Sequence, residues 1–216
     1  MALADAFGSS VDPSKTKNAD IRRVLNDCRK VIETVNKSKV LKAKFDEKQK
    51  NDLGKELKLK NTPSHRWSAT EDVLIKLLRC WNPLRHAFLE TNHLFRIENE
   101  KKILLELRSL IHPICNIQRM AQKTKELATF QVYVLLMHVY FSVLNENAKL
   151  PIYDPSLTFQ QQQTNNHHEL NPLDRLQPTS VSEPNLLDPR TFEVRKLLRK
   201  AMFDHFYRRY HPRLAY

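Results

Sequence analysis

Arg66 and Trp67, an arginine followed directly by a tryptophan, are the residue pair in this sequence with the clearest chemical use. They lie in the segment 62–81, which reads TPSHRWSATEDVLIKLLRCW. A guanidinium can pair with a phosphate, and a large aromatic ring can stack on a base or attract a cation to its face. The pair therefore makes nucleic acid a candidate partner.

The neighbouring residues predict how this pair is held. Ser68 is a good N-cap, and Glu71 follows it at the three-residue spacing of a capping box. The apolar stripe of an amphipathic helix begins just after them. Trp67 would then precede the cap and normally pack on the fourth helical residue, but that residue is Asp72. Two interpretations stay open: the indole packs against another helix, or it is exposed and stacks on a base or a partner surface.

The composition is typical of an almost purely helical protein. The chain has 216 residues, of which 41% are hydrophobic, 28% are charged and only two are glycine. Sheets, tight hairpins and phosphate-binding loops rely on glycine for positive φ angles, so its scarcity argues against them. We predict an all-α fold, specifically an irregular helical bundle.

The net charge of +12 is concentrated towards the two ends of the sequence. Residues 14–60 and 191–216 carry the excess of basic side chains, whereas residues 61–190 are close to balance. Two basic regions beside a nearly neutral core could form a surface that follows phosphates. They could equally be solvated helix faces without a ligand.

Apolar spacing and breaker residues divide the chain into four parts. We expect a flexible N-terminus over residues 1–17 and a helical bundle over 18–150. Residues 151–190 contain six prolines and a Gln/Asn-rich tract, which predict a disordered linker. Residues 191–216 should form a C-terminal basic helix that packs on the bundle, with Arg195 on its surface.

Within the bundle, the spacing of apolar residues predicts five helical stretches. They cover residues 18–38, 39–53, 68–88 with an interruption at Pro83, 97–125 with a kink at Pro113, and 127–145. The last stretch contains FQVYVLLMHVYFSVL at 130–144, the most apolar run of the chain. It is shorter than the ~20 residues that span a bilayer, so we expect the most deeply buried helix, with His138 in the core.

No set of residues for catalysis or metal binding stands out. Cys28, Cys80 and Cys115 are odd in number and far apart, which favours free thiols in a reducing compartment. Zinc-binding spacings, a nucleophile elbow and glycine-rich phosphate loops are not found in the sequence. Glu71 and Asp72 are interpreted as charges at a helix start or on a solvent face. We therefore predict no enzymatic activity, no metal, no cofactor and no membrane segment.

Several segments, in this order, resemble the hAT superfamily of DNA transposases and their domesticated, BED-finger-associated relatives. Pro63 and RWSATEDVL at 66–74 are similar to the family pattern P-T-R-W-N-S-T-x-D-M-L. Ser68 and Ala69 replace its Asn and Ser, and His65 replaces the threonine before the arginine. The resemblance extends over about residues 18–150 and 191–210, through the helical segments 31–45, 110–136 and 194–210.

The resemblance implies a role for the Arg-Trp pair. In that family an RNase H-like domain with an Asp-Asp-Glu triad cuts DNA, and a helical insertion domain that carries the Arg-Trp motif interrupts it. The tryptophan is implied to steady a flipped base while a DNA hairpin forms, and the matching residues here are Arg66 and Trp67. Nothing in this sequence matches the family's zinc finger, the strands with the two aspartates or the region with the glutamate.

The resemblance and the charge distribution together predict a nuclear, non-catalytic domain that binds DNA phosphates and one unstacked base. Arg66 and Trp67 would be central to binding. Further candidates for contacts with the DNA backbone are Arg22, Arg23, Lys58, Lys60, Arg208 and Arg209. Two alternatives stay open: a protein–protein interaction module that docks an intact transposase or another partner, and a decaying transposon remnant without a selected function.

Overall fold

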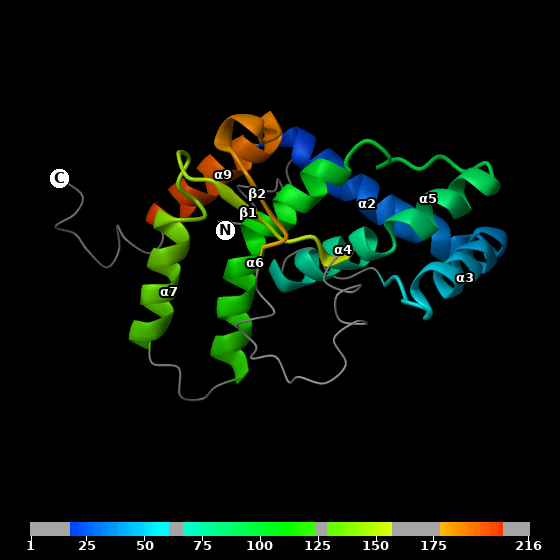
Figure 1. Cartoon of the computed structure of the whole chain (residues 1–216), viewed down its shortest axis with the longest axis horizontal. Helices are drawn as coiled ribbons and strands as arrows, with labels where there is room; N and C mark the ends of the chain where they lie inside the picture. Colours follow the sequence, from blue (N-terminus) through cyan, green and yellow to red (C-terminus); the bar gives the residue numbers. More distant parts are fainter. Residues whose placement is uncertain (1–17, 61–66, 124–128, 157–177, 205–216) are drawn as a thin grey trace.

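The computed structural model describes residues 18–60, 67–123, 129–156 and 178–204 (Figure 1). These residues form seven α-helices, a short 3-10 turn and two three-residue strands. The fold is therefore mostly helical, as the composition predicts, with one small antiparallel ribbon in addition. The predicted flexible N-terminus, residues 1–17, lies outside the described residues.

The first two helices, α2 (Ala19–Lys37) and α3 (Lys39–Leu53), begin and end where the sequence predicts. The side chain of Asn18 accepts a hydrogen bond from the backbone of Ile21, and Ser38 caps α3 in the same way. Gly54 ends α3 in the left-handed conformation with φ 65°, which glycine adopts without strain. The two helices pack on each other at a sharp corner around Ser38.

The amphipathic stretch after the Arg-Trp pair forms two helices, α4 (Trp67–Arg79) and α5 (Trp81–Glu90). The interruption comes at Cys80, not at Pro83. Pro83 occupies the first turn of α5, where a backbone N–H has no partner within the helix, so proline costs little there.

Helix α6 (Lys101–Lys123) is the centre of the fold, since it contacts α4, α7, α9 and the first strand. It continues through Pro113 as one helix. Its apolar side, which includes Ile103, Leu107 and Leu110, is fully buried in the common core. Four other elements are consequently placed against this one helix.

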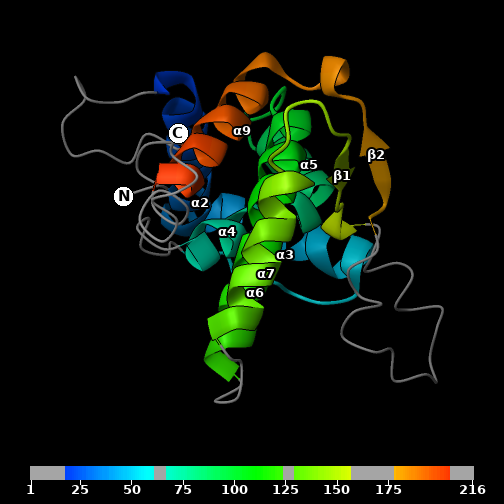
Figure 2. The same ribbon diagram turned by 90° about the vertical axis from the view of Figure 1, so that its left-hand side faces the viewer.

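Helix α7 (Thr129–Phe141) is much more exposed than its sequence predicts. Among its described side chains Val139 is buried, whereas Val134 is 47% and Phe141 58% exposed. His138, expected in the core, is on the surface. Figures 1 and 2 show α7 beside the C-terminal half of α6, projecting together beyond the other helices. Among the residues that the structure describes, α7 is therefore covered on one side and exposed on the other, although it is apolar on all sides.

The strands β1 (Leu150–Ile152) and β2 (Ser180–Ser182) pair antiparallel, with Leu150 opposite Ser182. Except for Leu150, they fall within residues 151–190, which the prolines led us to expect as a disordered linker. That expectation is wrong for the described parts of this range. Thr179 anchors the ribbon, because its backbone N–H and its hydroxyl both donate to the carbonyl of Ile152.

The final helix, α9 (Pro189–Met202), packs on α6 after a 3-10 turn (Pro184–Leu186). It begins at Asp188, whose side chain caps the backbone of Arg190. Arg195 is fully buried rather than on the surface, and its Nε donates to the carbonyl of Val143 at 2.8 Å. Burial lowers the pKa of Arg195 to about 10, so the guanidinium is still charged at neutral pH.

In the parts of the chain that the structure describes, we find no helix with both the length and the apolar character needed to cross a bilayer.

Candidate nucleic-acid interface

Five lysines surround the corner where α2 meets α3 and the chain after α3 returns to it. We call this surface the basic corner. It consists of Lys37, Lys39, Lys42, Lys58 and Lys60, all of which are exposed. Three of them come from the two helices, and two come from the extended segment after Gly54. The corner therefore brings together positive charges that are about 20 residues apart in the chain.

A side-chain hydrogen bond links α2 to the segment after α3 at this corner. The Asn36 amide at the end of α2 donates to the carbonyl of Leu59 at 3.3 Å. Leu59 itself is buried, with 6% of its surface exposed. In an extended segment successive side chains point to opposite sides, so the burial of Leu59 turns its neighbours Lys58 and Lys60 to solvent. The apolar–basic alternation of this short segment is the local cause of the exposed charge.

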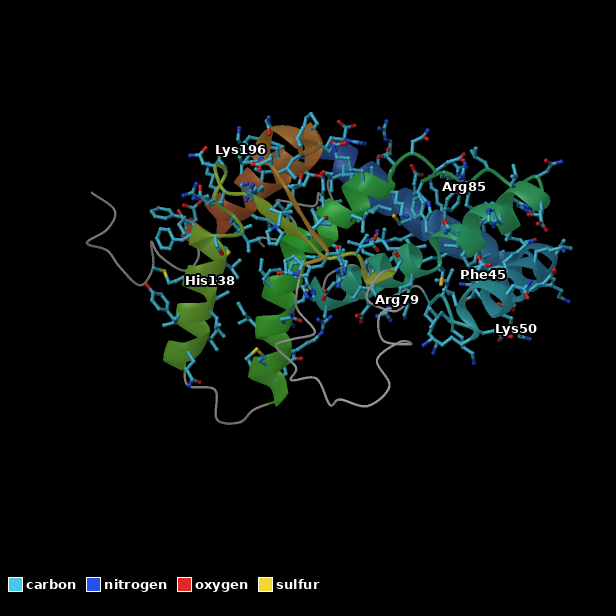
Figure 3. All side chains as sticks on the ribbon, viewed as in Figure 1. Phe45, Lys50, Arg79, Arg85, His138 and Lys196 are labelled. Atoms are coloured by element: carbon cyan, nitrogen blue, oxygen red, sulfur yellow. The ribbon has the colours of Figure 1, made fainter. Side chains whose placement is uncertain are left out.

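The lysines of the basic corner differ from the other lysines of α3. Lys44 pairs with Glu47 and Glu90, Lys48 lies 2.6 Å from Glu90, and Lys50 lies 2.9 Å from Glu56. Figure 3 shows Lys50 at the surface of the end of the molecule that α3 forms, whereas Phe45 of the same helix is buried. None of the five lysines of the basic corner forms an ion pair with any residue that the structure describes. Their charge is consequently available to an anionic partner.

The structure does not bring all the predicted contacts together. Arg23 is exposed and lies 3.7 Å from Asp20, and Arg22 is half-buried; both are in the first turns of α2. Lys37, at the other end of this helix, is 15 residues from Arg22, or roughly 22 Å at 1.5 Å per residue. Arg22 and Arg23 therefore lie at the far end of α2 from the basic corner, and their contact with the DNA backbone stays a prediction.

The side chains of four further predicted residues are not described by the structure. Arg66, Arg208 and Arg209 lie outside the described residues. For Trp67 the structure describes the backbone, which opens α4, but not the side chain. Ser68, the predicted N-cap, is the second residue of α4, so α4 includes two residues, Trp67 and Ser68, that the prediction placed before the helix.

The predicted capping role of Glu71 is wrong as well. Its carboxylate is fully buried between α4 and α6, where one oxygen lies 2.5 Å from His112 Nδ1 and the other 2.5 Å from Arg119 Nη2. Asp72, next to it, is exposed and lies 3.5 Å from the same Arg119 nitrogen. Glu71 thus ties the two helices together instead of closing its own helix end.

Asn116 completes this buried network. Its amide nitrogen lies 3.1 Å from His112 Nε2, and its oxygen accepts a hydrogen bond from Arg119. Each ring nitrogen of His112 therefore has one polar partner, Glu71 at Nδ1 and Asn116 at Nε2. Burial raises the pKa of Glu71, but the hydrogen bonds and charges of His112 and Arg119 outweigh it, so that the pKa is lowered overall.

The polar groups of this network are hydrogen-bonded to one another, which limits the chemistry that they can perform. Both ring nitrogens of His112 are engaged, so the imidazole has no free position for a substrate proton. Ser109, one turn earlier, donates to Leu105 and accepts from the backbone of Tyr153. Burial raises the pKa of the nearby Cys115 thiol far above neutrality, which leaves it unreactive. The arrangement is suited to fixing α4 on α6.

A signal for this network exists in the sequence and was missed. His112, Asn116 and Arg119 are spaced at four and three residues, so they form one polar stripe on an otherwise apolar helix. Glu71 falls on the apolar stripe of its own helix, in line with Leu74 and Leu78. A charged residue in the apolar stripe of one helix and a polar stripe on another together predict a buried ion pair.

Among the described residues, no three His, Cys, Asp or Glu side chains gather into a group that could hold a metal ion. Comparison with protein-family models, with curated proteins and with solved structures finds no match to this chain. The assignment of a function therefore depends on the residues themselves.

Proposed function

We propose that this chain is a non-catalytic, DNA-binding helical domain, derived from the insertion domain of an hAT-type transposase. The observation that carries the proposal is the basic corner, five exposed lysines without a carboxylate partner among the described residues. Each lysine that meets a phosphate releases condensed counterions from DNA, which is the main source of sequence-independent affinity.

The Arg-Trp pair follows the basic corner directly in the chain. Trp67 is seven residues after Lys60, so their backbones are at most ~25 Å apart even if the connection is fully extended. The buried Glu71 network holds α4, the helix that Trp67 begins, on the central helix α6. In the proposal the lysines bind the phosphate backbone, while Arg66 and Trp67 meet an adjacent phosphate and an unstacked base.

In this proposal the domain binds DNA and does not catalyse a reaction on it. The most enzyme-like group in the described part of the chain, Glu71 with His112, has its polar atoms engaged with one another and with Asn116 and Arg119. A transposase cuts DNA with carboxylates that hold metal ions, and the domain proposed here would contribute the DNA-binding part of such a protein. Its expected location is the nucleus, and it requires no cofactor.

A salt titration of DNA binding tests the proposal. Binding of the full chain to a 20-base-pair duplex and to a 20-base single strand is measured by fluorescence anisotropy between 50 and 300 mM NaCl. Three to five lysine–phosphate contacts give a slope of log K against log salt of about −3 to −4.5 for duplex DNA. Affinity that does not change with salt, or no binding at 50 mM, contradicts the proposal.

A further inference from the structure

Apolar side chains hold helix α9 on the central helix α6. Val194, Leu198, Ala201 and Met202 of α9 are buried, and α6 is the helix on which α9 packs. Figures 1 and 2 show α9 along the outside of the molecule. It is also the last helix that the structure describes, so its departure from α6 would leave the contacts among the other described helices in place.

The charge of Arg195, buried under α9, is poorly compensated. Its Nε donates to the carbonyl of Val143, but Nη1 and Nη2 are also buried and find no hydrogen-bond partner among the described residues. Glu146 attracts this guanidinium, yet the ion pair that Glu146 forms is with Arg199, at 3.9 Å. A buried charge with unpaired donors costs free energy as long as α9 is docked.

A second buried charge, the carboxylate of Glu106 on α6, lies where α9 begins. One of its oxygens accepts a hydrogen bond from the backbone N–H of Asp188 at 3.1 Å, and the other lies 3.9 Å from Lys102 Nζ. Burial raises the pKa of Glu106, and the hydrogen bonds and charges around it do not offset this effect. Among the described residues, no ion pair joins Glu106 to Arg195. The contact between α6 and α9 therefore buries two opposite charges that do not neutralise each other.

The contact between α4 and α6 is built differently. Burial acts on its carboxylate, Glu71, as well, but the pairing with His112 and Arg119 outweighs it and the pKa is lowered. The elements of one fold differ in the free energy at which they open, and unpaired buried charges reduce that free energy. The comparison favours α9 as the helix that opens before the core.

Docking of α9 also engages three of its basic side chains. Residues 189–202 contain five basic residues and one acidic residue. Arg190 and Arg199 lie 2.8 and 3.9 Å from carboxylates of other elements, and Arg195 is buried. The two lysines of the helix are exposed, and Figure 3 shows Lys196 at the surface. A released α9 would present all five positive charges.

We infer that α9 is a releasable helix, which leaves α6 at a lower free energy than the core unfolds and then binds the DNA backbone through its arginines. Without DNA the apolar side chains keep α9 docked. With DNA the phosphates compensate the arginines, and a ligand that binds only the released form shifts the equilibrium towards it. The release does not depend on the proposed function, whereas the choice of DNA as the ligand rests on it.

Thiol labelling of the full chain measures the release. Val194 of α9 and Val31 of α2 are both helical valines with 0% exposure, so Val194→Cys and Val31→Cys are matched variants. The native thiols are buried. A disulfide reagent at pH 8 should label Val194→Cys at least ~100-fold faster than Val31→Cys, because only the first position becomes accessible when α9 alone opens. Equal rates would show that α9 opens only together with the core and would overturn the inference.

Hydrogen exchange of the wild-type chain makes the same comparison without a substitution, and it decides the question if either variant does not fold. The amides of α9 should exchange at least ~100-fold faster than those of α2 and α6. Equal protection of the three helices would overturn the inference.

The role of the buried guanidinium is tested in the Val194→Cys chain. Arg195→Met should slow the labelling about tenfold, because a methionine fills similar space without the buried charge. The control Lys200→Met removes one positive charge from an exposed position of the same helix and should change the rate less than about twofold. Faster labelling after Arg195→Met would show that the guanidinium holds α9 in place, which would overturn the proposed cause of its release.

A 20-base-pair duplex tests the ligand. At saturation it should speed the labelling of Val194→Cys at least about threefold and leave that of Val31→Cys unchanged. If the duplex binds and the first rate does not rise, the assignment of α9 as a DNA-binding helix is wrong. If the duplex does not bind at all, the proposed function fails, while the comparison of the two rates without DNA still decides the release.

Discussion

His112 of α6 and Glu71 of α4 share a hydrogen bond of 2.5 Å, which joins helices whose contributing residues are 41 positions apart. Glu71 is fully buried, and Arg119 supplies the compensating positive charge. A buried carboxylate costs free energy unless it is paired, so both partners are required for α4 to pack on the central helix.

Removal of the buried charge should destabilise the protein. We expect Glu71→Gln to lower the free energy of unfolding by about 3 kcal/mol, because the amide leaves Arg119 without its carboxylate and disturbs the bond to His112. Urea denaturation followed by circular dichroism measures the change. Asp72→Asn is the matched control on the exposed side of α4 and should cost less than about 0.5 kcal/mol. Equal losses for the two variants would show that the network contributes no specific stability.

The lowered pKa of Glu71 has a consequence for pH dependence. Between the folded pKa and the ordinary glutamate pKa of about 4.3, the unfolded state binds more protons than the folded state. The stabilisation is thus fully present above the unfolded pKa and is lost as the pH falls through the folded pKa. We expect the stability difference between wild type and Glu71→Gln to be constant from pH 6 to 8 and to shrink below pH 4. A difference that grows on acidification would contradict the assigned pairing.

The three thiols should resist modification while the protein is folded. Burial raises the pKa of Cys28 and that of Cys80 to about 12, and it raises the pKa of Cys115 as well. Since the thiolate is the reactive form, a disulfide reagent at pH 8 should modify the native protein at least a hundredfold more slowly than the urea-unfolded protein. Fast reaction of one thiol equivalent in native buffer would show that one of these cysteines is accessible.

The Arg-Trp pair should matter most for single strands. We expect Trp67→Ala to weaken single-strand binding by about 1–3 kcal/mol, the usual contribution of one stacked base, and Trp67→Phe to retain most of the affinity. Arg66→Ala should weaken both kinds of DNA through the lost phosphate contact. Arg85→Ala, which removes an exposed arginine paired with Glu98 at 3.1 Å, is the charge-matched control. Unchanged single-strand affinity in Trp67→Ala would remove the stacking part of the proposal.

The sequence predicts structure best here where one residue determines the local structure by its own chemistry. Asn18, Ser38 and Gly54 mark helix ends through their own backbone or side-chain chemistry, and the structure has those ends. Glu71 was misinterpreted because a carboxylate three residues after a serine also fits a local cap. Its true partners, His112 and Arg119, are distant in the chain.

Burial was harder to predict than helix formation. The apolar run of α7 implies a buried helix, but what covers a helix depends on its neighbours, and α6 covers one side of it. The ribbon of β1 and β2 was missed for the opposite reason, since an edge strand tolerates a proline and Pro151 is the middle residue of β1. For the candidate site, Lys58 and Lys60 were found from charge alone. Lys37, Lys39 and Lys42 join them through the contact between Asn36 and Leu59, which the sequence does not reveal.

The most direct test of the account compares two triple variants in the salt titration of duplex binding. Lys39→Gln/Lys58→Gln/Lys60→Gln removes three charges from the basic corner, and Lys44→Gln/Lys48→Gln/Lys50→Gln removes three charges that already pair with carboxylates. Both variants have the same net charge. We expect the first to reduce the salt slope by up to about 2.7 and to weaken binding at least tenfold at 100 mM NaCl, and the second to change neither. Equal effects of the two variants would mean that net charge alone attracts DNA, which would contradict a binding surface at this corner.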